Sequence, residues 1–155
     1  MNLTMKNTME NKMNHAADEH LSEHFTLGEM VRSGTAIRLG IGNEPDGEAV
    51  ENLRHLCSEV LEPLRRRYGR IIITSGFRCE RLNEAVGGAK GSQHLRGEAA
   101  DIHVTCTEMC NRYAEFIRQN TDFDQLICEP IGAKGKRWLH VSFTRRRANR
   151  HEVIR

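Results

Sequence analysis

The sequence has no long apolar run. Residues 1–20 hold no continuous apolar stretch, whereas a secretory signal peptide needs one of about seven to fifteen residues. No later segment approaches the roughly 20 apolar residues of a transmembrane helix. We therefore expect a protein that is cytoplasmic as synthesised and has no membrane partner. Because residues 1–20 also lack apolar periodicity, they are predicted to be a disordered leader.

Paired cysteines are missing as well. The five cysteines include no Cys-x-x-Cys pair, and an odd number cannot all be joined within one chain. Cys106 and Cys110 are four residues apart, but no second pair of similar spacing completes a cysteine-based zinc site. This pattern favours reduced thiols over a disulfide framework.

The sequence has no overall excess of one charge. The net charge is +2, which indicates no particular partner. Only residues 145–155 are biased, with five arginines. We interpret this segment as a solvated, frayed basic tail. Binding of nucleic acid or another polyanion is the alternative, but no nucleic-acid partner is expected. The protein is expected to be a monomer.

Apolar periodicity is clear in the middle of the chain. At 155 residues the length suits one globular domain. Apolar residues at helical spacing predict a helix over 48–68, kinked near Pro63, and a second over 107–120, capped by Thr105 or Thr107. A capping box formed by Thr26 and Glu29 predicts a short helix over 27–33.

Short β-branched or alternating runs predict strands. They cover residues 71–74, 99–104, 125–128 and 138–143. A Gly/Lys-containing turn joins the last two, which predicts an antiparallel hairpin. The predicted fold is α+β, with a small, largely antiparallel sheet packed against two main helices.

Two histidines and one aspartate stand out beside these strands. His94 lies in a glycine-containing loop, Asp101 begins a buried strand, and His140 lies between Leu139 and Val141. A carboxylate at a buried strand is costly unless it is paired or bound to a metal. Two imidazoles and one carboxylate can hold a catalytic Zn²⁺ with a fourth position open to water or substrate. Taken singly, they read as a loop histidine, a strand-start aspartate and a half-buried histidine without a common role.

The motifs around these residues resemble the zinc D-Ala-D-Ala carboxypeptidase and peptidoglycan endopeptidase family. The likeness is strongest to its branch of small phage and bacterial enzymes, and it covers about residues 21–143. The motifs that carry it are Ser75-Gly76-Phe77-Arg78, Asn83 with Val86-Gly87-Gly88, Ser92-Gln93-His94-Leu95-x-Gly97-x-Ala99-Ala100-Asp101 and Trp138-Leu139-His140-Val141-Ser142.

The resemblance implies the fold of Hedgehog and D-Ala-D-Ala peptidase domains, with a zinc peptidase domain over residues 21–144. It implies that His94, Asp101 and His140 bind Zn²⁺. It further implies that Arg78 stabilises an oxyanion or orients the substrate, a structural ion pair being the alternative.

The resemblance also suggests substrate-binding roles for two residues that precede the first histidine. Ser92 matches a position that hydrogen-bonds substrate, although it can equally cap a turn. Gln93 is a further candidate for the same role.

The general base departs from the pattern of many family members, which place an acid three residues before the last histidine. Here that residue is Arg137, which cannot accept a proton. Glu129 is the preferred candidate, because the predicted hairpin brings it towards His140. Glu98 is the rival, and the absence of any protein base is the third possibility. His103 shares a predicted strand face with Asp101, so it either lines the site or is an exposed edge residue.

We therefore expect a zinc metallopeptidase that cleaves peptidoglycan stem peptides, as a D-Ala-D-Ala carboxypeptidase or an L-Ala-D-Glu endopeptidase. The alternative is an inactive zinc-binding domain that recognises the cell wall or a partner. Without a signal peptide, release through a holin pore, as for a prophage enzyme, or by a non-classical route is expected. Recycling of wall fragments in the cytoplasm is the other option.

Overall fold

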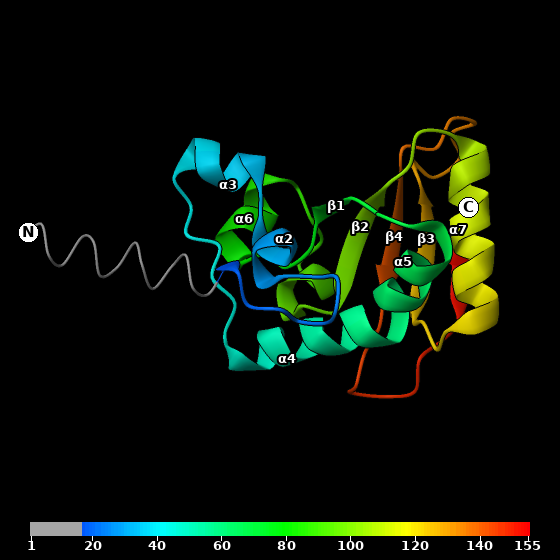
Figure 1. The fold of residues 1–155 in the computed structure, drawn as a ribbon. Helices are drawn as coiled ribbons and strands as arrows, with labels where there is room; N and C mark the ends of the chain where they lie inside the picture. Colours follow the sequence, from blue (N-terminus) through cyan, green and yellow to red (C-terminus); the bar gives the residue numbers. More distant parts are fainter. Residues whose placement is uncertain (1–16) are drawn as a thin grey trace, which may run out of the picture.

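The computed structural model describes residues 17–155, and its centre is one five-stranded sheet (Figure 1). The strand order is β1-β2-β4-β3-β5. All neighbouring pairs are antiparallel except β3 and β5, which are parallel. The strands are β1 Ile73–Ser75, β2 Ala99–His103, β3 Gln125–Glu129, β4 Trp138–Ser142 and β5 Glu152–Ile154. The predicted α+β class and the β3–β4 hairpin are confirmed.

The segment α4–η1–α5 and helix α7 pack against one face of this sheet. The helices are α2 Leu27–Val31, α3 Gly34–Leu39, α4 Gly47–Leu56, η1 Cys57–Leu61, α5 Glu62–Tyr68, α6 Glu80–Ala85, η2 Gln93–Arg96 and α7 Thr107–Asn120. Figure 1 shows α4 and α5 along the lower side of the sheet, α7 beside β3, and α2, α3 and α6 grouped near β1. Among residues 17–155, no helix combines the length and apolar character needed to cross a membrane.

Strand alternation divides the sheet into a covered and an open face. Leu126, Leu139 and Val141 are fully buried in the core under the helices. Their neighbours along the strands, including Ile127 and His140, are half-buried. Because successive side chains point to opposite faces, His140 lies on the face away from the helical core.

The predicted helix over 48–68 is one continuous helical segment with a π turn, η1, between α4 and α5. Pro63 lies at the start of α5 and has no backbone N–H. An α-helix through this point would leave a carbonyl without its donor, and a π turn absorbs such a break. In place of the expected kink near Pro63, the structure therefore has the π-helical turn η1.

Two other helix predictions need correction. The helix expected over 27–33 ends at Val31, and a second short helix, α3, follows. Ser33 caps α3 by accepting a hydrogen bond from the backbone N–H of Ala36 at 3.1 Å. The N-cap of α7 is Cys106, without a side-chain bond, so the expectation of Thr105 or Thr107 was wrong.

The C-terminal segment differs most from its prediction. Residues 145–155 were expected to be a frayed tail, but β5 pairs with β3, Leu126 opposite Val153. Arg146 forms an ion pair with buried Glu98. Arg147 and Arg150 form ion pairs with buried Asp124. The basic run is therefore part of the folded domain, because its charges neutralise interior carboxylates.

The N-terminal leader was predicted over residues 1–20. Residues 1–16 lie outside the described part of the chain. His20 forms a β-bridge with Thr26, and Arg54 donates a hydrogen bond to the carbonyl of His20 at 3.1 Å. The last residues of the predicted leader therefore contact the domain.

Candidate metal centre

Three side chains from two strands and one short helix meet on the open face of the sheet. Asp101 on β2 lies directly opposite His140 on β4. His94 comes from η2, just before β2. Nδ1 of His140 is 3.0 Å from Oδ1 of Asp101, and Nε2 of His94 is 3.4 Å from the same oxygen. The structure thus brings together all three predicted metal ligands.

These separations fit a tetrahedral metal site. One ligand atom from each of the three residues lies within 4.8 Å of the other two. With metal–ligand bonds of about 2.0–2.1 Å, two ligand atoms of a tetrahedral site lie about 3.3–3.4 Å apart. The observed 3.0 and 3.4 Å from Asp101 are close to that edge, so Asp101 requires little movement to share one ion with either histidine.

The hydrogen bonding of His94 also fits a metal. Its Nδ1 is 2.6 Å from the carbonyl oxygen of Gly76, so Nδ1 carries the hydrogen and donates it. Nε2 of the same ring faces an Asp101 carboxylate oxygen at 3.4 Å. Either a proton on Nε2 or a metal cation can lie between these two atoms. A backbone carbonyl that fixes the tautomer is the usual outer contact of a metal-bound histidine.

Two glycines make this geometry possible. A Cβ on Gly76 would lie 2.3 Å from the carbonyl oxygen of Met30, so only glycine permits this close approach. Gly97 has a φ of 73° and follows η2. Its left-handed backbone, which glycine adopts at little cost, turns the chain from His94 into β2 and Asp101.

Arg78 lies beside the ligand set. Its Nη2 is 3.4 Å from Oδ2 of Asp101, and its Nε donates to Ser75 Oγ at 3.0 Å. Nη1 donates to Asn83 at 3.2 Å. The guanidinium is therefore held in one orientation, so the structural ion pair is present. A fixed cation next to the ligands is also suited to stabilising developing negative charge.

Asp101 is held as a carboxylate. Burial on its own would raise the pKa of Asp101, but the hydrogen bonds and charge of His140 and His94 keep this pKa well below its usual value. An ionised carboxylate is the form that binds a metal cation.

The two acidic candidates for the base differ sharply. Glu129 lies opposite Trp138 on the open face, one diagonal step from His140, or about 7 Å between Cα atoms. One of its oxygens accepts the N–H of Ile131 at 3.1 Å. Glu98 is fully buried and bonded to Thr144 and Arg146. Glu98 is therefore wrong as the rival base, because both of its oxygens are bonded to Thr144 or Arg146 and it lies in the interior.

The two predicted substrate-binding residues have structural contacts of their own. Ser92 Oγ accepts the backbone N–H of His94 at 3.3 Å and caps η2, which is the turn-capping alternative. Gln93 Nε2 donates to Asp124 Oδ2 at 3.0 Å. Both also line a cavity with His140, so contact with a ligand stays a prediction.

Two cavities flank the three ligands. The first has a volume of about 620 Å³, and its lining includes Asp101, His103, Trp138 and the exposed Arg137. The second, of about 410 Å³, includes His140. The arrangement gives a peptide chain room on both sides of the metal centre. His103, ambiguous in the sequence, lines the first cavity.

A second group of possible ligands, Glu23, His24 and Glu62, lies elsewhere. Glu62 is buried and already accepts hydrogen bonds from Ser22 Oγ, His24 N–H and His24 Nδ1 at 2.6–2.8 Å. Burial would raise the pKa of Glu62, but these bonds lower it. The group fastens residues 22–24 to the long helical segment, a contact that local patterns could not reveal.

The fold thus places two histidines and one aspartate where they can hold a single metal ion. The model of the family described as Peptidase M15 matches residues 23–142, and the chain belongs to this family of zinc-dependent peptidases. The predicted family is thereby confirmed. A comparison with curated proteins gives no match.

Proposed function

We propose that this protein is a zinc-dependent peptidase that hydrolyses peptide bonds in peptidoglycan stem peptides, as a D-Ala-D-Ala carboxypeptidase or an L-Ala-D-Glu endopeptidase. The observation that carries the proposal is the convergence of His94, Asp101 and His140 at 3.0–3.4 Å on an open sheet face. The flanking cavities support a substrate that extends to both sides.

His94, Asp101 and His140 would hold the zinc ion. When bound, zinc supplies Lewis acidity, which makes water deprotonate near neutral pH and polarises a carbonyl group. Glu129 accepts the proton of the attacking water, since its carboxylate shares the open face with His140. Arg78 stabilises negative charge on the substrate, because three hydrogen bonds fix its guanidinium beside the centre.

Digestion of purified muropeptides by the zinc-loaded protein, followed by mass spectrometry, tests this proposal. A new fragment would identify both the activity and the bond that is cut. The matched variant His94→Ala should lose zinc and cleavage together. Full cleavage by a zinc-free His94→Ala protein would disprove the assigned role of the centre.

The second candidate is a zinc-binding domain without catalysis, used for recognition of the cell wall or a partner. Exposed Arg137 occupies the position where many family members have an acid. Glu129→Gln separates the two candidates: an enzyme should lose turnover by about 10²–10⁴-fold while metal analysis still finds one zinc. If neither the wild type nor Glu129→Gln shows turnover although both bind one zinc, the recognition domain is favoured.

A further inference from the structure

The cavity next to His140 has an unusual wall. The polar residues of this wall are Ser92, Gln93, Gln125, Arg146, Arg147 and Arg150. Its lining includes no acidic residue. Three guanidinium groups therefore border one side of the metal centre.

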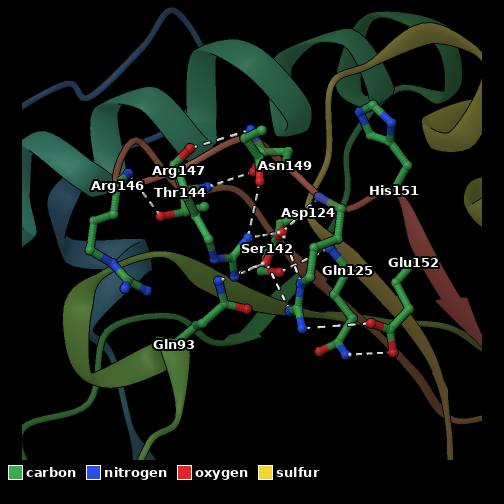
Figure 2. A network of polar contacts seen from close by, with 12 residues as sticks. Gln93, Asp124, Gln125, Ser142, Thr144, Arg146, Arg147, Asn149, His151 and Glu152 are labelled. Carbon is green, nitrogen blue, oxygen red and sulfur yellow. Dashed lines mark hydrogen bonds and ion pairs between the residues drawn. The ribbon is translucent and has the colours of Figure 1, made fainter.

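Buried acids hold these arginines in place. Asp124 and Glu98 are fully inaccessible, whereas the side chains of Arg146, Arg147 and Arg150 are 40–43% exposed. The negative ends of the ion pairs thus lie in the interior and the positive ends border the cavity. Figure 2 shows Asp124 within the network, with Gln93 and Arg147 around it.

Asp124 accepts hydrogen bonds from two arginine side chains. Arg147 donates to both of its oxygens at 2.7 and 3.1 Å, and Arg150 donates to both at 3.1 and 3.0 Å. One carboxylate therefore faces two guanidinium groups, and Nη1 of Arg150 also lies 3.6 Å from Oε2 of Glu152, which is outside the cavity lining. The hydrogen bonds of Arg147 and Arg150 hold the pKa of Asp124 well below its usual value against the effect of burial, so the carboxylate stays ionised and keeps both arginines oriented.

Donors remain for a ligand. Arg146 contacts Glu98 through Nε and Nη2. Within residues 17–155, the hydrogen bonds of Arg146 use Nε and Nη2 and leave Nη1 without a partner, and those of Arg147 use Nη1 and Nη2 and leave Nε without one. A carboxylate binds such oriented guanidinium donors well, because little side-chain entropy is lost.

The position of the wall suggests what reaches it. Ile127 pairs with His140, and Gln125 lies two residues along β3 on the same face, about 7 Å away. This is one to two peptide units from the metal centre. The three arginines of the wall, Arg146, Arg147 and Arg150, lie beyond the part of the chain that the family model matches.

We propose that the cavity formed by His140, Gln125 and the arginines of residues 146–150 binds a carboxylate of the substrate peptide, with Arg147 as its main charge partner. This inference rests on the proposed function, since the peptide is the substrate of the same centre. The substrate class is an acidic stem peptide with a free carboxylate one or two residues from the scissile bond.

The test measures binding to metal-free protein, so that zinc contributes nothing. The probes are L-Ala-γ-D-Glu-L-Lys-D-Ala-D-Ala, the same peptide amidated at the α-carboxylate of D-Glu, and the peptide amidated at its C-terminus. Calorimetry at low salt should show about 10-fold weaker binding when the recognised carboxylate is amidated. The amidation that weakens binding identifies the carboxylate that the cavity recognises. Added salt should reduce the difference in affinity between the free and the amidated peptide.

In Arg147→Gln, the affinity ratio between the peptide with the free carboxylate and the amidated peptide should fall close to one. The substitution leaves Asp124 with Arg150 and Gln93 as partners, so the buried charge stays neutralised. Arg145→Gln is the matched control, because Arg145 is outside the cavity lining and donates to Asn52. It should keep the preference.

Thermal unfolding will show whether Arg147→Gln still folds. If it does not, a second variant provides the test. Glu98→Gln combined with Arg146→Gln removes a buried acid together with its counter-ion, and it should lower the preference at least threefold. Equal affinity of the wild type for all three peptides, or an unchanged preference in the folded arginine variants, overturns the proposal.

Mass spectrometry of the same peptides with zinc-loaded protein separates this inference from the proposed function. Cleavage without any carboxylate preference removes only the cavity proposal. A carboxylate preference in binding without cleavage of any stem peptide removes the enzyme proposal and leaves the binding site.

Discussion

Asp101 and His140 are directly cross-strand partners, and the sheet itself brings Oδ1 of Asp101 to 3.0 Å from Nδ1 of His140. Since neighbouring strands fix this pair, the ligand geometry depends on strand register and not on a mobile loop. A shift of register by one residue would turn His140 towards the core.

We predict that Asp101→Asn and His140→Ala each lower zinc affinity at least 100-fold, because a catalytic zinc has only three protein ligands. Metal analysis after dialysis against a weak chelator measures the loss. His103→Ala is the matched control. His103 shares the open face but is not in the ligand group, so this variant should keep one zinc. Full zinc content in Asp101→Asn would contradict the assignment.

Gly76 gives a second prediction, about the outer contact of His94. In Gly76→Ala the new Cβ would meet Met30 O at 2.3 Å, which must displace the carbonyl that holds Nδ1 of His94. We expect a lower melting temperature and zinc binding weakened about 10–100-fold.

Gly91→Ala is the control for this substitution. Gly91 lies in the loop before η2, and a Cβ there has no atom within 4 Å. Its melting temperature and zinc affinity should stay close to those of the wild type. If Gly76→Ala behaves like Gly91→Ala, the carbonyl of Gly76 does not position the histidine.

The ligands were predictable from the sequence through their residue types together with the family resemblance, because Asp101 and His140 are 39 residues apart. Local patterns contributed the strand alternation that turns His140 away from Leu139 and Val141, and the short loop through Gly97 that keeps His94 near Asp101. The long helix and the β3–β4 hairpin followed from periodicity and turn residues. Each of these signals lies within about 20 residues of sequence.

The C-terminal segment was not predictable in this way. A run of arginines is usually a solvated surface, and its partners Glu98 and Asp124 lie 48 and 23 residues away from Arg146 and Arg147. Nothing local distinguishes a buried aspartate with two distant counter-ions from an exposed one. The parallel strand β5 was missed for the same reason, because its pairing with β3 is non-local.

Asp124 leads to a prediction about pH. Its pKa is lowered in the folded protein, compared with about 3.9 in an unfolded chain. Its stabilising effect is therefore complete above about pH 4 and is lost as the pH falls towards the folded-state pKa. Urea unfolding between about pH 2.5 and 5 should show stability falling with acidity in the wild type.

Asp124→Asn should flatten this acid limb and lower the stability at pH 7 by about 2 kcal/mol, through loss of charge-assisted hydrogen bonds. Asp122→Asn is the matched control, because Asp122 is exposed. An acid limb in Asp124→Asn as steep as that of the wild type would assign the pH dependence to other carboxylates.

The strand β5 gives the last prediction. A chain that ends at His151 loses the parallel partner of β3, so the backbone of Gln125 to Ile127 loses its β5 partner. It also loses Val153, which packs against the core. We expect a loss of about 1–3 kcal/mol of unfolding free energy, as for removal of a valine-sized apolar side chain. Denaturant unfolding measures it.

Removal of Arg155 alone, which takes away only a surface hydrogen bond to Asn111, should cost less than about 0.5 kcal/mol. Equal stability of the two truncated proteins would show that residues 152–154 contribute little, as expected of a frayed tail.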